Sequence, residues 1–74
     1  MHNFTLYTTG CSKCLILEQQ LKNKNISFSK ITDLETLMFE ADKHQISSAP
    51  FLKIDSVFYD FRSAMRFINA YENN

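Results

Sequence analysis

The sequence predicts a single α/β domain, in which three helices pack on a four-stranded mixed sheet in the order βαβαββα. Short runs of β-forming residues alternate with helix-like patterns along the chain. A chain of 74 residues has room for one domain only, covering residues 1–74. The single glycine, Gly10, and the single proline, Pro50, both fall at expected element boundaries, where backbone punctuation is most informative.

Each element is expected from a local pattern. Residues 4–8 are rich in β-formers, and residues 26–31 alternate between polar and apolar. A strand–helix–strand crossover makes these two strands parallel. The Thr32-Asp33-Leu34-Glu35 segment has the spacing of a capping box, Asp55-Ser56 suits a tight hairpin turn, and Asp60 can cap a last helix. The expected helices run from about 12 to 24, from this capping box to near residues 44–45, and onward from residue 61; the hairpin strands are 51–54 and 57–59.

Apolar spacing predicts which positions are buried. The expected core comprises Leu6, Leu17, Leu21, Ile31, Leu37, Leu52, Ile54 and Ile68. On the second helix the apolar positions Leu34, Leu37, Met38 and Ala41 follow helical spacing, as do Phe61, Ala64, Met65, Ile68 and Tyr71 on the third. Each of these two helices should therefore bury one stripe against the sheet.

The segment Cys11-Ser12-Lys13-Cys14 contains the only two cysteines of the chain. It lies between a predicted strand and a predicted helix, and a helix N-terminus stabilises a thiolate. Cys11 should face solvent, with the positive charge of Lys13 nearby, whereas Cys14 lies one turn in. The sequence therefore predicts thiol–disulfide exchange, with Cys11 as the more exposed and more readily ionised thiol.

Charge and composition restrict the setting in which this chemistry would occur. Eight basic and eight acidic residues give zero formal net charge, which argues against nucleic acid or an anionic membrane as the partner. No apolar run reaches the length of a membrane span, and the first residues do not resemble a signal peptide. We therefore expect a cytoplasmic protein, because close cysteines in that reducing compartment indicate redox or metal chemistry.

Two other interpretations of the cysteine pair remain open. The thiols could be unreactive core residues. Alternatively, Cys11 and Cys14 could be zinc ligands completed by His2 and His44, although the two histidines lack the paired spacing of zinc sites.

Three segments together resemble the thioredoxin superfamily: Gly10-Cys11-Ser12-Lys13-Cys14, Ser48-Ala49-Pro50-Phe51 and Asp60-Phe61-Arg62. Without an extra N-terminal strand–helix unit, the chain resembles the glutaredoxins, and most closely the NrdH-type redoxins, which are electron donors of ribonucleotide reductase. The resemblance covers nearly the whole chain and implies a thioredoxin/glutaredoxin-like fold.

The resemblance also implies roles for individual residues. Cys11 matches the attacking thiol, Cys14 the resolving thiol, and Pro50 a cis-proline that faces them. Only about 5–6% of X–Pro bonds are cis in general, so this expectation rests on the resemblance. Lys13, Pro50 and the backbone of Ala49 would form the substrate groove. The segment Asp60-Phe61-Arg62 would contact a partner or the reductant.

The function implied is a small dithiol–disulfide oxidoreductase that reduces a target protein through a reversible Cys11–Cys14 disulfide. The target that the resemblance implies is ribonucleotide reductase. We expect a monomer without a bound cofactor or metal, reduced by NADPH through a thioredoxin-reductase-type flavoprotein or by glutathione. Glutathione is the less favoured reductant, because the Gly-Gly turn that holds it in glutaredoxins is absent and Asp60 would repel its carboxylates by about 1 kcal/mol. The alternative is a non-catalytic thioredoxin-fold module that binds a partner or senses redox state.

Overall fold

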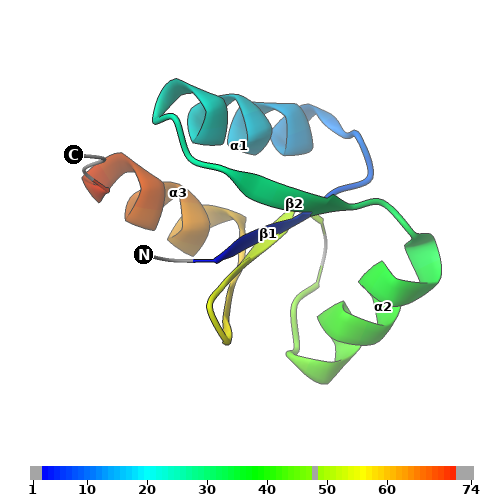
Figure 1. Ribbon diagram of the computed structural model, residues 1–74. Coiled ribbons are helices and arrows are strands. Elements are labelled where there is room, and N and C mark those ends of the chain that lie inside the picture. Colours follow the sequence, from blue (N-terminus) through cyan, green and yellow to red (C-terminus); the bar gives the residue numbers. More distant parts are fainter. Residues whose placement is uncertain (1–2, 48, 72–74) are drawn as a thin grey trace.

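The computed structural model describes residues 3–47 and 49–71, and these form three helices and four strands (Figure 1). The order βαβαββα and the α/β class are confirmed. In chain order the elements are β1 (Phe4–Tyr7), α1 (Ser12–Asn23), β2 (Phe28–Ile31), α2 (Leu34–Lys43), β3 (Phe51–Ile54), β4 (Val57–Tyr59) and α3 (Phe61–Ala70).

The four strands form one mixed sheet in the order β2-β1-β3-β4. β1 pairs parallel with β2, as the crossover rule predicts, and antiparallel with β3, while β3 and β4 form the expected hairpin. In this register Tyr7 at the end of β1 lies opposite Phe51 at the start of β3. The residues that follow β1 and those that precede β3 therefore lie close together at the same end of the sheet.

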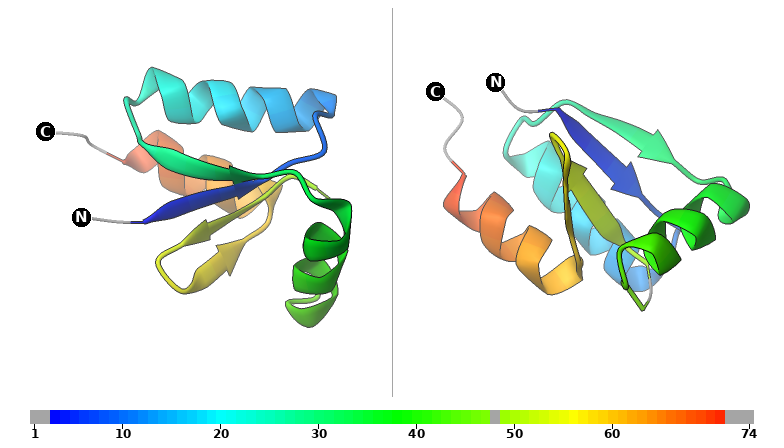
Figure 2. Two further views of the ribbon diagram at one scale, coloured as in Figure 1. Left: turned by 45° about the vertical axis from the view of Figure 1, so that its right-hand side comes forward. Right: turned by 90° about the horizontal axis from the view of Figure 1, so that it is seen from below.

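The helices divide between the two faces of the sheet (Figure 2). α1 and α3 pack side by side on one face, over a core that includes Leu6, Leu17 and Ile68. α2 lies on the other face, where Leu37 packs near the stacked rings of Tyr7 and Phe51. No helix in residues 3–47 and 49–71 is long and apolar enough to cross a membrane.

The predicted core is largely confirmed. Leu6, Leu17, Leu21, Leu37, Leu52, Ile54 and Ile68 are all buried. Ile31 is only half-buried, because it belongs to β2 at the edge of the sheet. The buried stripe of α3 is also confirmed at Ala64 and Ile68.

The second helix differs from the prediction. Its N-cap is Asp33, whose carboxylate accepts the Thr36 N–H at 3.0 Å, so the capping box expected to start at Thr32 is wrong. Leu34 and Met38 are 61% and 63% exposed. Helical spacing identified the side on which they lie, but this short helix contacts the sheet through a narrower strip around Leu37.

The second strand begins later than expected. The Asn25 backbone has a φ of 57°, and the Ile26 N–H donates to the Leu21 carbonyl at 3.0 Å. Ile26 is buried by this turn at the end of α1 and does not pair in the sheet, so β2 begins at Phe28.

Candidate functional site

The two cysteines lie where the chain passes from β1 into α1. Gly10 has a φ of +82°, which glycine adopts at little cost, and this residue turns the chain away from the sheet. Cys11 is extended, with φ −70° and ψ 173°, and is the N-cap of α1; Cys14 lies in the first helical turn. The predicted placement of a thiol at a helix N-terminus is thus present.

The Cys11 sulfur occupies the position of an anionic helix cap. Its Sγ accepts the backbone N–H of Cys14 at 3.2 Å. The other two helices begin in the same way with carboxylates: Asp33 accepts the Thr36 N–H at 3.0 Å and Asp60 accepts the Ser63 N–H at 2.8 Å. Asp and Asn, with Ser and Thr, are the preferred N-caps, and a helix N-terminus favours negative charge. The Cys11 sulfur therefore takes the place at α1 that a carboxylate takes at α2 and α3.

The two thiols differ in exposure in the predicted direction. Cys11 is half-buried, whereas Cys14 is completely buried. Burial alone would raise the pKa of Cys14, but hydrogen bonds from the side chains of Cys11 and Thr8 and from the backbone and side chain of Thr9 outweigh it and lower the pKa to about 6. Because the two cysteine side chains interact, the proton lost in this range belongs to the pair.

Pro50 lies at the same end of the sheet as the two cysteines. It is buried directly before β3, and the Ala49–Pro50 peptide bond is cis, as predicted. Antiparallel pairing of Tyr7 with Phe51 brings this segment to the end of β1 from which the Cys11 loop departs. Ala49 is half-buried, and Ser48 of the quoted motif lies outside the described residues.

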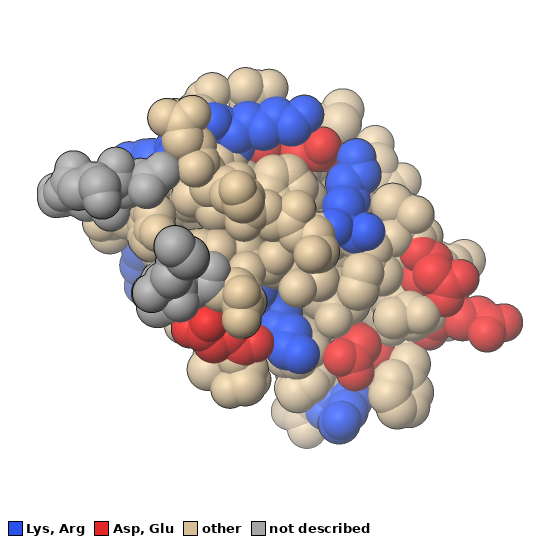
Figure 3. Space-filling view, in the orientation of Figure 1, with Lys and Arg blue, Asp and Glu red and all other residues tan. Residues whose placement is uncertain are grey.

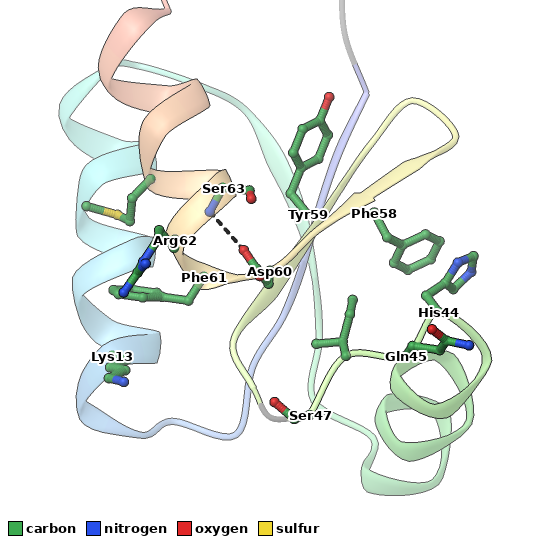
Figure 4. A pocket seen from close by; sticks show the side chains of 12 residues that line it. Lys13, His44, Gln45, Ser47, Phe58, Tyr59, Asp60, Phe61, Arg62 and Ser63 are labelled. Atoms are coloured by element: carbon green, nitrogen blue, oxygen red, sulfur yellow. Dashed lines mark hydrogen bonds between the residues drawn. The ribbon is translucent and has the colours of Figure 1, made fainter.

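A groove of about 900 Å³ lies between the starts of α1 and α3 on one side and the end of α2 on the other (Figure 4). It unites four predicted site residues, Lys13, Asp60, Phe61 and Arg62. The Lys13 ammonium lies 5.7 Å from the centre of the Phe61 ring. The opposite wall is formed by residues 44–47.

The charge around the groove is mixed. Lys13 and Arg62 are exposed cations, whereas the Asp60 carboxylate is turned to the helix, where the Ser63 N–H and hydroxyl, with Arg62 and Arg66, hold the pKa of Asp60 below its usual value. Acidic side chains gather instead toward α2 (Figure 3). The groove is therefore suited to a segment that is neutral or carries a carboxylate.

The sequence did not identify two parts of the site. Thr8 is 2% exposed, and the Thr9 hydroxyl lies 3.7 Å from the Cys14 sulfur. Two consecutive hydroxyl residues, separated from the Cys-x-x-Cys segment by Gly10, are the signal that could have indicated them. The second part is the groove wall at residues 44–47, which has no motif of its own.

Of the two histidines in the zinc hypothesis, the structure describes only His44. His2 lies outside the described residues, and His44 stacks on Phe58 with ring centres 3.8 Å apart. Across residues 3–47 and 49–71, no three His, Cys, Asp or Glu side chains gather at metal-binding distance.

No protein-family model, curated protein sequence or solved structure matches this chain. The site consists of a half-buried sulfur that caps α1, a buried thiol in the first turn of that helix, and a groove that Lys13 lines but neither cysteine does.

Proposed function

We propose that this protein is a small dithiol–disulfide oxidoreductase, a glutaredoxin-like electron carrier that reduces a disulfide in a target protein. The observation that carries the proposal is the hydrogen bond from the Cys14 N–H to the half-exposed Cys11 sulfur, with the Cys14 thiol buried behind it. This arrangement gives the two sulfurs different tasks.

In the first step the Cys11 thiolate attacks one sulfur of the target disulfide. A Cys11–target bond forms, the target disulfide breaks, and the second target sulfur leaves as a thiolate that takes a proton from solvent. Thiolates, and not thiols, are the nucleophiles, so stabilisation of charge on Cys11 by the helix N-terminus promotes this step.

In the second step the Cys14 thiolate attacks the Cys11 sulfur. The Cys11–Cys14 disulfide forms, the bond to the target breaks, and the target is released as a dithiol after proton uptake. Two electrons pass from the cysteine pair to the target. Because Cys14 is fully buried, it is shielded from external disulfides and encounters only the sulfur of Cys11.

The groove beside the thiols accommodates the target. Lys13 and Arg62 favour a segment with a carboxylate near its disulfide, and the Phe61 ring between them offers apolar contact. At the same end of the sheet as the cysteines, the backbone of Ala49 can pair with an extended segment of the target. The resemblance to NrdH-type redoxins supports ribonucleotide reductase as the target.

Asp60 supports a flavoprotein as the source of electrons. In glutaredoxins, backbone N–H groups near the last helix hold glutathione. In this chain the Asp60 carboxylate already accepts the Ser63 N–H at the start of α3. A glutathione carboxylate would have to compete with that bond and would face the same negative charge. A thioredoxin-reductase-type flavoprotein, supplied by NADPH, needs no such site.

Trapping of the mixed disulfide tests the proposal. Cys14→Ser lacks the resolving sulfur and should accumulate a disulfide between Cys11 and a model target protein, detected by mass spectrometry. Cys11→Ser is the matched control and should trap none. Trapping through Cys14 would reverse the assigned roles.

The alternatives give distinct results. A protein that forms the Cys11–Cys14 disulfide but transfers no electrons to any disulfide would be a redox-sensing module. A zinc protein would contain about one metal ion per chain by elemental analysis, and bound metal would protect both thiols from alkylation.

A further inference from the structure

The buried thiol presents a problem that the cysteine pair alone does not solve. Cys14 must lose its proton to attack Cys11, yet burial in an apolar surrounding disfavours a thiolate. Strand β1 contains no acidic residue that could take the proton. Once Cys11 is bonded to a target, its own thiolate and thiol are no longer present. Other groups must then stabilise charge on Cys14.

Two threonines precede the turn at Gly10, and the hydroxyl of one of them lies at hydrogen-bond distance from this sulfur. The Thr9 Oγ1 is 3.7 Å from the Cys14 Sγ. Thr8 is 2% exposed, and its Oγ1 accepts the Gly10 N–H at 3.1 Å. A hydroxyl has a single proton to donate. The Gly10 N–H occupies a lone pair of Thr8 Oγ1 and does not use the proton of that hydroxyl. The Thr8 side chain also lowers the pKa of Cys14.

We propose that Thr8 and Thr9 are positioning residues that hold Cys14 ready for attack by donating their hydroxyl protons to its sulfur. This inference rests on the proposed function, in which Cys14 is the resolving thiol. Neutral hydroxyl donors, in place of a buried carboxylate, stabilise the negative charge on the Cys14 sulfur. The Cys14 proton is lost to solvent, and the released target thiolate takes up a proton from solvent.

The charged groups around this end of the molecule do not replace these donors. In α1, Lys13 is exposed, and Glu18 is paired with Lys30 of β2 at 3.2 Å and with Lys22 at 3.4 Å. In α3, which packs against α1, Arg62 and Arg66 are exposed, as is Asp60, the N-cap of that helix. The interactions that lower the pKa of Cys14 come from Cys11, Thr8 and Thr9.

Titration of Cys14 provides the direct test. In a Cys11→Ser background only Cys14 can ionise as a thiol, and its thiolate is followed by ultraviolet absorbance. Adding Thr8→Val or Thr9→Val should raise the midpoint of the Cys14 titration by about one pH unit, which is a roughly tenfold change in the ionisation equilibrium of this thiol. Thr8→Ser and Thr9→Ser should restore it. Thr5→Val, the same change within the preceding strand β1, should leave the midpoint unchanged.

The second readout is the resolving step itself. A mixed disulfide of Cys11 with thionitrobenzoate is prepared in the full-length protein, and attack by Cys14 releases coloured thionitrobenzoate. At pH values below the titration midpoint of the parent, release should be about tenfold slower in the valine variants than in the parent at the same pH, and the pH profile should shift to higher pH with the midpoint.

These outcomes separate the inference from the proposed function, because neither readout uses a target protein. An unchanged midpoint in both valine variants, or failure of serine to restore it, would overturn the inference. If Thr8→Val does not fold, Thr9→Val still decides, because Thr9 is exposed and lies outside the strand. A shifted midpoint in a protein that reduces no target would leave the inference standing and refute the proposed function.

Discussion

The lowered pKa of Cys14 predicts that the reduced protein becomes more stable as the pH rises. An ordinary cysteine ionises near pH 8.5. In the folded protein the pKa of Cys14 lies at about 6. The folded state therefore binds fewer protons than the unfolded state between these two values, and stability increases with pH across that interval.

The magnitude follows from the interval. A difference of about 2.5 pH units corresponds to roughly 3 kcal/mol in the free energy of unfolding. This value is an upper bound, because Cys14 interacts with a neighbouring side chain and the proton lost in this range belongs to the pair. The contribution is complete above about pH 8.5 and is lost as the pH falls through about 6.

Urea unfolding of the protein, kept reduced, over this pH range measures the effect. Cys14→Ser is the matched control, because it retains every other titrating group that the structure describes. The free energy of unfolding of the parent should rise relative to that of Cys14→Ser between about pH 6 and pH 8.5. A difference that stays constant or falls over this interval would refute the assignment of a stabilised thiolate to the pair.

Three further predictions concern the caps and the groove. Cys11→Ala should lower the stability of the reduced protein by about 1 kcal/mol in urea unfolding, whereas Cys11→Asp should preserve the cap. Asp60→Gly should increase turnover with glutathione and glutathione reductase. Asp60→Asn removes the charge but keeps a capping side chain, so comparing the two variants shows whether the charge or the cap excludes glutathione. Unchanged turnover in both would mean that Asp60 does not exclude glutathione. Lys13→Glu with Arg62→Glu should slow reduction of an acidic disulfide peptide about two- to fivefold per charge, with little effect on a neutral peptide.

Features governed by short-range rules were predictable from the sequence. The Cys11-Ser12-Lys13-Cys14 segment after a strand placed a sulfur at a helix N-terminus, and Asp60 was recognised as a cap. The cis state of Pro50 was predicted only through the resemblance, because the general frequency of cis X–Pro bonds argues against it.

Features that depend on tertiary contacts were not predictable. Helical spacing placed Leu34 and Met38 on the apolar side of α2, but it could not show that this helix meets the sheet only around Leu37. Likewise, Thr8 was predicted only as the last residue of a strand, and Thr9 only as part of the break that follows it. Their hydroxyls gain a role because the turn at Gly10 brings the first turn of α1 back over them.

A single-turnover experiment tests the central claim most directly. The reduced protein is mixed with a protein disulfide in the absence of any other reductant, and both proteins are analysed by mass spectrometry after acid quenching. We expect one target disulfide to be reduced for each Cys11–Cys14 disulfide formed, with no transfer by Cys11→Ser. A target that stays oxidised while the cysteine pair stays reduced, or a pair that oxidises without reducing the target, would contradict the claim that this chain carries electrons to disulfides.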